Sequence, residues 1–188
     1  AWSGYESVEN NIELKNLTDG DYTIRVIGAM RNGDPSSEGP AVSYTWTVDN
    51  VAPVCTISNL PANPTNSQKT FIVVSSESPD IAGYRYRLYM NGSPQALSGK
   101  YLIEDPIQLT SLPEGSYTIK VMGVDFAGNQ QSEETAAEWS WVVDTQAPKA
   151  TLSNLPEPNT NINSIDVGVG PQNDAVAYKY LLSGATWS

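Results

Sequence analysis

The feature that most constrains this chain is an internal repeat with an offset of 95 residues. The sequence GDYTIRVIG at residues 20–28 recurs as GSYTIKVMG at 115–123, and VDNVAP at 48–53 recurs as VDTQAP at 143–148. Self-similarity in register over this length is typical of tandem domains rather than of one larger fold. The chain of 188 residues is therefore about two repeats long.

The repeat is out of phase with the ends of the sequence. The Val-Asp-x-x-Ala-Pro segments mark boundaries between domains, because proline ends a strand and stiffens a link. They predict one complete domain at residues 49–143, the C-terminal half of a domain at 1–48, and the N-terminal half of another at 144–188.

The complete domain is predicted to be all-β. Residues 83–90 alternate with period two, which places Tyr84, Tyr86 and Leu88 on the inner face and two arginines on the outer face. The expected strands are residues 55–60, 70–75, 83–90, 107–109, 116–125 and 138–143. No window of ten or more residues shows sustained helical periodicity. Short strands at this spacing predict a β-sandwich.

Two segments resemble the tyrosine corner of immunoglobulin-like and fibronectin type III domains: LTDGDY at residues 17–22 and LPEGSY at 112–117. With the Tyr-x-Tyr-x-Leu strand at 84–88 and DFAGN at 125–129, the chain resembles tandem immunoglobulin-like repeats of bacterial surface and secreted proteins. The resemblance implies end-to-end sandwiches of about 95 residues, an extracellular or cell-surface location, and no catalytic residues.

Composition excludes several classes of function. The chain has no histidine, which removes Ser-His-Asp and Cys-His catalysis and histidine-metal centres. It has 21 acidic and 10 basic residues, so a basic footprint for nucleic acid or anionic lipid is absent. No apolar run approaches the ~20 residues of a membrane span. We predict neither an enzyme nor a protein that holds a cofactor, and we expect no membrane insertion.

The two half-domains pose a physical problem, because neither carries enough strands to cover its own inner face. Each large side chain left in water forgoes ~1.5–3 kcal/mol, and unpaired strand edges invite pairing with another chain. We therefore expect these faces to be contacts between subunits. Their residues are Ile12, Leu14, Tyr22, Ile24, Val26, Trp46, Ile165, Val167, Tyr178, Tyr180 and Leu182.

Three arrangements would complete the halves: a longer continuous array, closure within one chain, or head-to-tail completion between copies of the chain. Closure within one chain is disfavoured, because the links at 49–52 and 144–147 are too short to fold both halves back past a strand of ~27 Å. Completion between copies is strand complementation. Because donor and acceptor faces differ, such contacts do not close and would produce a linear filament.

The sequence thus predicts a structural segment of an extracellular filament. The alternative is an adhesin stalk or carbohydrate-binding appendage, in which Trp2 and Trp187 would contact a glycan or cell surface. Both tryptophans lie in similar sequences, AWS and ATWS, and this duplication argues against a simple join of one copy to the next. Trp139 and Trp141 share a strand face, so we expect them in the core rather than in a sugar site.

Two aspartates at the links and the cysteine of the first strand are further candidate sites. Asp49 and Asp144 precede the proline links, where calcium stiffens some extracellular arrays. Calcium needs ~6–8 oxygen ligands and no dense run of aspartates is present, so turn formation is the favoured role. Cys55 is matched by Ala150 in the next repeat and has no partner for an intrachain disulfide.

Overall fold

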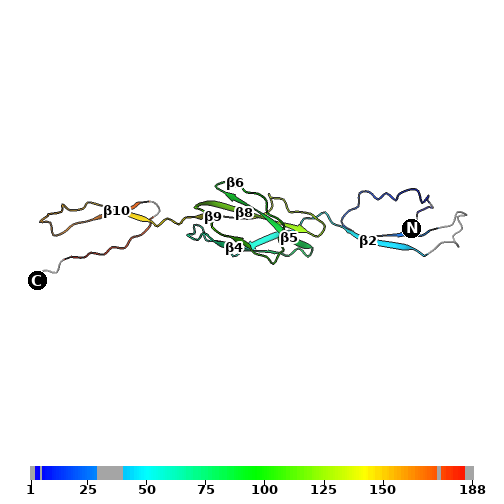
Figure 1. Ribbon diagram of the computed structural model, residues 1–188, viewed down its shortest axis with the longest axis horizontal. Coiled ribbons are helices and arrows are strands. Elements are labelled where there is room, and N and C mark those ends of the chain that lie inside the picture. Colours follow the sequence, from blue (N-terminus) through cyan, green and yellow to red (C-terminus); the bar gives the residue numbers. More distant parts are fainter. Residues whose placement is uncertain (1–2, 5, 29–39, 173–174, 185–188) are drawn as a thin grey trace. The chain divides into compact units, whose positions relative to one another are not determined.

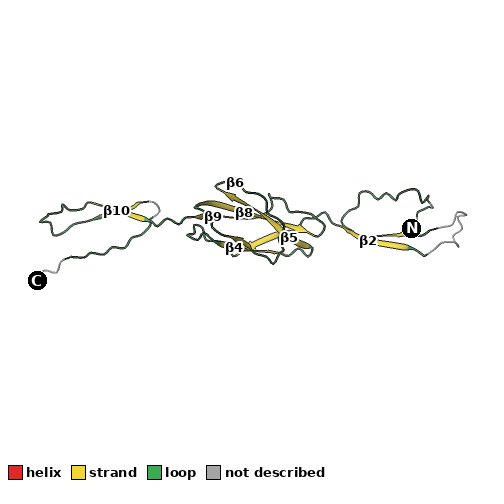
Figure 2. Ribbon diagram, viewed as in Figure 1, coloured by secondary structure: helices red, strands yellow, loops and turns green. Residues whose placement is uncertain are grey.

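The structure is a computed structural model that describes residues 3–4, 6–28, 40–172 and 175–184. Within these ranges the regular secondary structure is entirely β, and all paired strands are antiparallel (Figures 1 and 2). The all-β class predicted from the sequence is therefore confirmed. The chain divides into two compact units, Ala1–Val143 and Asp144–Ser188.

Residues 49–143 contain two antiparallel sheets with the strand orders β3-β4-β7 and β6-β5-β8-β9. The strands are β3 (Cys55–Ser58), β4 (Thr70–Ser76), β5 (Ile81–Met90), β6 (Ser93–Pro94), β7 (Ile107–Leu109), β8 (Gly115–Asp125) and β9 (Ala137–Val143). Every strand predicted from the sequence is present, with ends that differ by at most two residues. The short strand β6 was not predicted.

One hydrophobic core joins the two sheets. Ile72 and Val74 of β4 pack with Tyr117 and Ile119 of β8, and Trp141 of β9 belongs to the same buried cluster. A core filled from the inner faces of two sheets is consistent with a β-sandwich. The longest ladders run from β8 to β5 and to β9, so β8 is paired along both of its edges.

Successive side chains of β4 point alternately into the core and toward solvent. Ile72 and Val74 are buried, whereas Phe71 and Val73 point outward and are 53% and 39% exposed. Residues 70–75 carry apolar side chains on both faces, Phe71 and Val73 on one and Ile72 and Val74 on the other, and the core takes the second. Apolar residues on both faces of a strand give no period-two signal with which to choose.

The corner before β8 is fixed by hydrogen bonds. The Tyr117 hydroxyl donates to the Pro113 carbonyl oxygen at 2.8 Å. Gly115 has φ +146°, and a Cβ there would lie 2.8 Å from Oδ1 of Asn91. That Oδ1 accepts a hydrogen bond from the Ser116 backbone N–H at 3.0 Å. The positive φ favours glycine here, and any Cβ would also have to displace the Asn91 side chain from its hydrogen bond.

Within residues 6–28 and 40–48, the strands are β1 (Gly20–Val26) and β2 (Val42–Val48). Their register, with Tyr22 opposite Trp46, is the register of β8 and β9 shifted by 95 residues. The corner hydrogen bond also recurs, because the Tyr22 hydroxyl donates to the Thr18 carbonyl oxygen at 2.8 Å. The Tyr22–Trp46 rings stack at 5.7 Å, and the equivalent Tyr117–Trp141 rings stack at 5.4 Å.

The second unit contains the strands β10 (Lys149–Ser153) and β11 (Gly168–Gln172). Their register is that of β3 and β4 shifted by the same 95 residues, so that Ser153 pairs with Gly168 as Ser58 pairs with Val73. Residues 175–184, which include the counterpart of β5, form no strand.

Candidate interaction surfaces

The first candidate surface is the inner face of the β1–β2 hairpin with the segment before it. Ile12, Leu14 and Val26 are exposed, and Tyr22, Ile24 and Trp46 are only half-buried. Their repeat counterparts in the central domain are all buried: Ile107, Leu109, Val121, Tyr117, Ile119 and Trp141. The same side chains are therefore present in the hairpin without the sheet that covers them.

The second candidate surface lies in residues 144–184. Ile165 and Val167 are exposed, and so are Tyr178, Tyr180 and Leu182. The contrast with the central domain is largest at the tyrosine of the third strand, because Tyr84 is 0% exposed and its counterpart Tyr178 is 61% exposed. All eleven residues predicted as half-domain faces thus remain at least partly accessible within the described residues.

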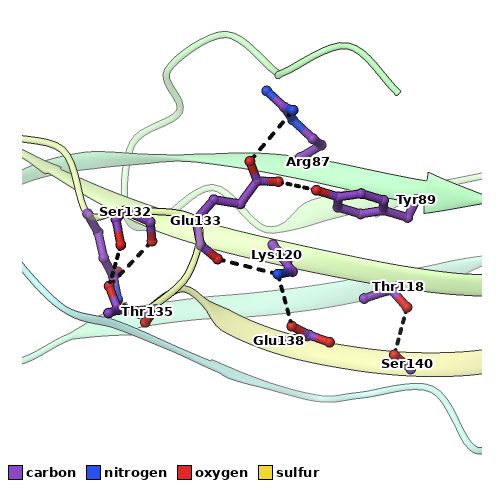
Figure 3. Close-up of polar contacts among 10 residues, drawn as sticks. Arg87, Tyr89, Thr118, Lys120, Ser132, Glu133, Thr135, Glu138 and Ser140 are labelled. Carbon is purple, nitrogen blue, oxygen red and sulfur yellow. Dashed lines mark hydrogen bonds and ion pairs between the residues drawn. The ribbon is translucent and has the colours of Figure 1, made fainter. Parts of the chain in front are cut away.

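The outer face of the four-stranded sheet carries a polar cluster that the sequence did not predict (Figure 3). Glu133 accepts a hydrogen bond from the Tyr89 hydroxyl and forms an ion pair with Arg87 at 3.6 Å. Lys120 lies 3.4 Å from the Glu138 carboxylate and also donates to the Glu133 backbone oxygen. The hydrogen bond to Glu133 is the main cause that raises the pKa of Tyr89. These contacts hold the loop before β9 against β5 and β8.

A shallow cavity of about 300 Å³ opens beside the third strand of the central domain. It is lined by Tyr86, Tyr101, Asp105, Pro106, Ile107 and Gln108. The Tyr101 ring lies 5.8 Å from that of Tyr86 and is 40% exposed. An accessible aromatic ring beside polar groups is a combination that binds ligands with mixed polar and apolar surfaces.

Three carboxylates meet near the first link: Asp49, Asp80 and Asp125 have oxygens within 4.8 Å of one another. The sequence missed this cluster, because its members come from separate turns. The buried Asp125 already accepts hydrogen bonds from the Gly128 and Asn129 backbone N–H groups and from the Asn129 amide. Burial alone raises the pKa of Asp125, but these hydrogen bonds outweigh it and leave the pKa below its ordinary value.

The two link aspartates form the same turn. Oδ1 of Asp49 accepts from the Val51 N–H at 2.9 Å, and Oδ1 of Asp144 accepts from the Gln146 N–H at 2.9 Å. The side chain of Asn129 donates to the Asp49 carbonyl oxygen at 3.0 Å. Asn129, which is itself held by Asp125, therefore connects the turn after β8 to the first link. Both link aspartates form the turn that the sequence favoured.

Other predicted residues take ordinary structural places. Cys55 is buried in the core, and burial raises the pKa of its thiol to about 11, so the thiol stays protonated at neutral pH. Trp141 is buried and Trp139 packs against the core, as expected. Trp2 and Trp187, the residues of the glycan-binding alternative, lie outside the described residues.

Comparisons with known proteins add no family. No protein-family model matches the chain, and the search of curated proteins found no match. Among the described residues, no helix is long and apolar enough to cross a membrane.

Proposed function

We propose that this chain is a structural segment of an extracellular filament built from immunoglobulin-like β-sandwich domains in tandem. Each half-domain is completed by a neighbour, either the adjoining part of a continuous array or another copy of the chain. The observation that carries the proposal is the agreement between repeats. Both flanking hairpins have the strand register of the central sheets at the same offset of 95 residues.

The agreement extends to side-chain contacts. The Thr23 and Thr45 hydroxyls pair across β1 and β2 at 2.9 Å, and Thr118 and Ser140 pair at 2.7 Å at the matched positions. The Asn59 side chain donates to the Phe71 carbonyl oxygen, as the Asn154 side chain donates to a matched carbonyl. Such detail supports the view that each flanking region is part of a domain of the central type. The extracellular location rests on the resemblance of the repeats to bacterial surface proteins.

A mechanical role follows from the strand pairing of the central domain. Tension applied at the two ends of the domain loads β3 and β9, and β9 is held by its antiparallel ladder with β8, which runs from Gly115↔Val143 to Val121↔Ala137. The links contain Pro53 and Pro148, which limit the bending between domains. A chain of such domains transmits tension over long distances without needing a catalytic site.

Single-molecule force spectroscopy of the full chain tests this role. The central domain should unfold in one cooperative step that releases about 30 nm, since an extended residue spans about 3.3–3.6 Å and the domain has about 95 residues. Extension without a resolved force step would contradict a load-bearing function. The measurement uses single molecules, so its outcome does not depend on whether copies associate.

A second function, glycan binding by an adhesin stalk, is favoured by the cavity beside Tyr101. Aromatic rings and carboxylates are the groups that such ligands contact. A glycan array with the full chain tests it, and Tyr101→Ala should abolish any binding. Phe126→Ala is the control, because Phe126 is an 81% exposed ring that does not line this cavity. Binding unaffected by Tyr101→Ala would exclude the cavity as the site.

A further inference from the structure

We propose that the central domain binds an extended, uncharged oligosaccharide across two adjoining cavities, with Tyr101 in the first and Phe71 in the second. The inference rests on the glycan-binding function proposed above, and it names the class of glycan. All the residues involved belong to the complete domain at 49–143, so the site does not depend on how the half-domains are completed.

The second cavity has a volume of about 440 Å³ and adjoins the cavity that contains Tyr101. Pro106 and Gln108 line both cavities, and both residues are exposed, so no buried segment separates the two spaces. Phe71 of β4 lines the second cavity and is 53% exposed. A ligand that crosses Pro106 and Gln108 therefore meets an accessible aromatic residue in each cavity.

Polar side chains accompany the aromatic residue in each cavity. Gln108, whose side chain is an amide, lines both, and Thr110, whose side chain carries a hydroxyl, lines the second. A sugar ring has apolar C–H groups on its faces and hydroxyls around its rim, so it is complementary to an aromatic face with amides and hydroxyls beside it. Two adjoining cavities of this composition match several linked sugars better than a single one.

The charges of the lining residues favour an uncharged ligand. Asp105 lines the first cavity and Lys69 lines the second, so the site carries one charge of each sign. The chain as a whole has a net charge of −11, which repels polyanions. A neutral oligosaccharide is therefore favoured over acidic polysaccharides and nucleic acids.

A protein partner is less suited to this surface. Phe71 and Val73 are the exposed apolar residues on the outer face of β4, and the hydroxyls of Thr56 and Ser75 are already hydrogen-bonded to each other at 2.8 Å. Two apolar side chains supply far less area than the ~800 Å² that each partner buries in a standard protein interface. β7 has three residues and so offers few backbone groups to an added peptide strand.

Comparison with the next repeat indicates that the fold does not require Phe71. Because β10 and β11 have the register of β3 and β4, Asp166 takes the place of Phe71. The buried neighbour Ile72 is matched instead by the apolar Val167. The repeat therefore keeps an apolar side chain where the strand meets the core and varies the side chain where it meets solvent, so Phe71 contributes to the outer surface rather than to packing.

A glycan array with the full chain as the probe tests the length and charge of the ligand. The array carries each uncharged glycan as a monosaccharide and as oligomers of increasing length, together with acidic oligomers. Longer uncharged oligomers should bind ~10-fold more tightly than the monosaccharide of the same sugar, because only they reach both aromatic residues. Acidic oligomers should bind more weakly at low salt, because the chain is negatively charged.

Phe71→Ala tests the second cavity separately from the first. It should lower the affinity for the longer oligomers ~10-fold and leave the affinity for the monosaccharide unchanged. Phe71→Asp, which introduces the residue of the next repeat, should act in the same way. Phe126→Ala is the matched control, since Phe126 is exposed and lines neither cavity. Circular dichroism should show the native β signal in all three variants.

Three outcomes would overturn the inference: equal affinity for the monosaccharide and its oligomers, tighter binding of the acidic oligomers, or equal losses in Phe71→Ala and Phe126→Ala. Glycan binding that Tyr101→Ala abolishes would still stand in each of these cases. Retention of no glycan at all, or binding that Tyr101→Ala leaves intact, would instead contradict the glycan-binding function itself.

Discussion

Tyr84 and Tyr178 occupy the same place in two successive repeats, yet the first is fully buried and the second is mostly exposed. The same contrast separates Trp141 from Trp46 and Ile72 from Val167. The β1–β2 and β8–β9 hairpins share their register and their corner hydrogen bond, whereas residues 178–182 form no strand although 84–88 lie in β5. The repeat therefore encodes its hairpins locally, whereas burial requires the second sheet of a complete domain.

The largest difference is expected on truncating the matched tryptophans. Trp141→Ala should destabilise the central domain by about 3–5 kcal/mol, because it leaves a cavity in the core. Trp46→Ala should change the same transition by less than about 0.5 kcal/mol and, if copies of the chain complete the hairpin, should weaken their association. Urea unfolding followed by circular dichroism measures the first effect, and sedimentation measures the second. Equal losses of stability in both variants would contradict the claim that only Trp141 lies in a complete core.

The turn after β8 should show the next largest effect. The matched position of Asp125 in the first repeat is Met30, so only the central domain has this aspartate. Asp125→Ala removes three hydrogen bonds to a charged group and should cost at least about 1.5–3 kcal/mol. Urea unfolding at neutral pH measures the loss, and Glu77→Gln, at an exposed acid, should be near neutral.

Acid should act through the same residue. The folded pKa of Asp125 is lowered, so its contribution to stability is present above the unfolded pKa of about 4 and is lost as the pH falls through the folded pKa. Unfolding free energy should therefore decline over this range, and Asp125→Asn should make the decline shallower. An identical pH profile in the variant would contradict the assigned role.

A smaller effect is expected at the tyrosine corners. Tyr117→Phe removes the hydrogen bond to Pro113 and should cost about 1 kcal/mol in the central transition. Tyr22→Phe removes a hydrogen bond of the same length, but it should leave that transition unchanged. If copies complete the hairpin, Tyr22→Phe should weaken association by a similar free energy. Differential scanning calorimetry of both variants at low and high concentration separates these cases.

The smallest effect is expected on the outer face. Glu133→Gln weakens the ion pair with Arg87, in which the two side chains are 30% and 31% exposed, and surface ion pairs contribute about 0.2–1 kcal/mol. The loss should shrink further in high salt, because screening acts on exposed charges. A salt-independent loss above this range would assign Glu133 a larger structural role than its contacts indicate.

Much of the fold could be predicted because its signals are local. Alternation along residues 83–90 placed the inner face of β5, and the predicted strand ends lie within two residues of the observed ones. The sequence could not show which face of β4 is buried, because Phe71 and Val73 are as apolar as Ile72 and Val74. The carboxylates near Asp49 and the cluster around Glu133 were missed, since each joins segments that are distant in sequence.

The sequence by itself determined the repeat, its offset, the strand alternation and the residues of the two half-domain faces. These depend on neighbouring residues and on comparison of one repeat with the next. The tertiary structure was needed to show which face of β4 enters the core, because both faces of that strand are apolar. It also decided that residues 178–182 stay unpaired while 84–88 form the centre of a sheet. The physical reason is that a strand is stable only where a partner takes its hydrogen bonds and a second sheet removes its apolar face from water.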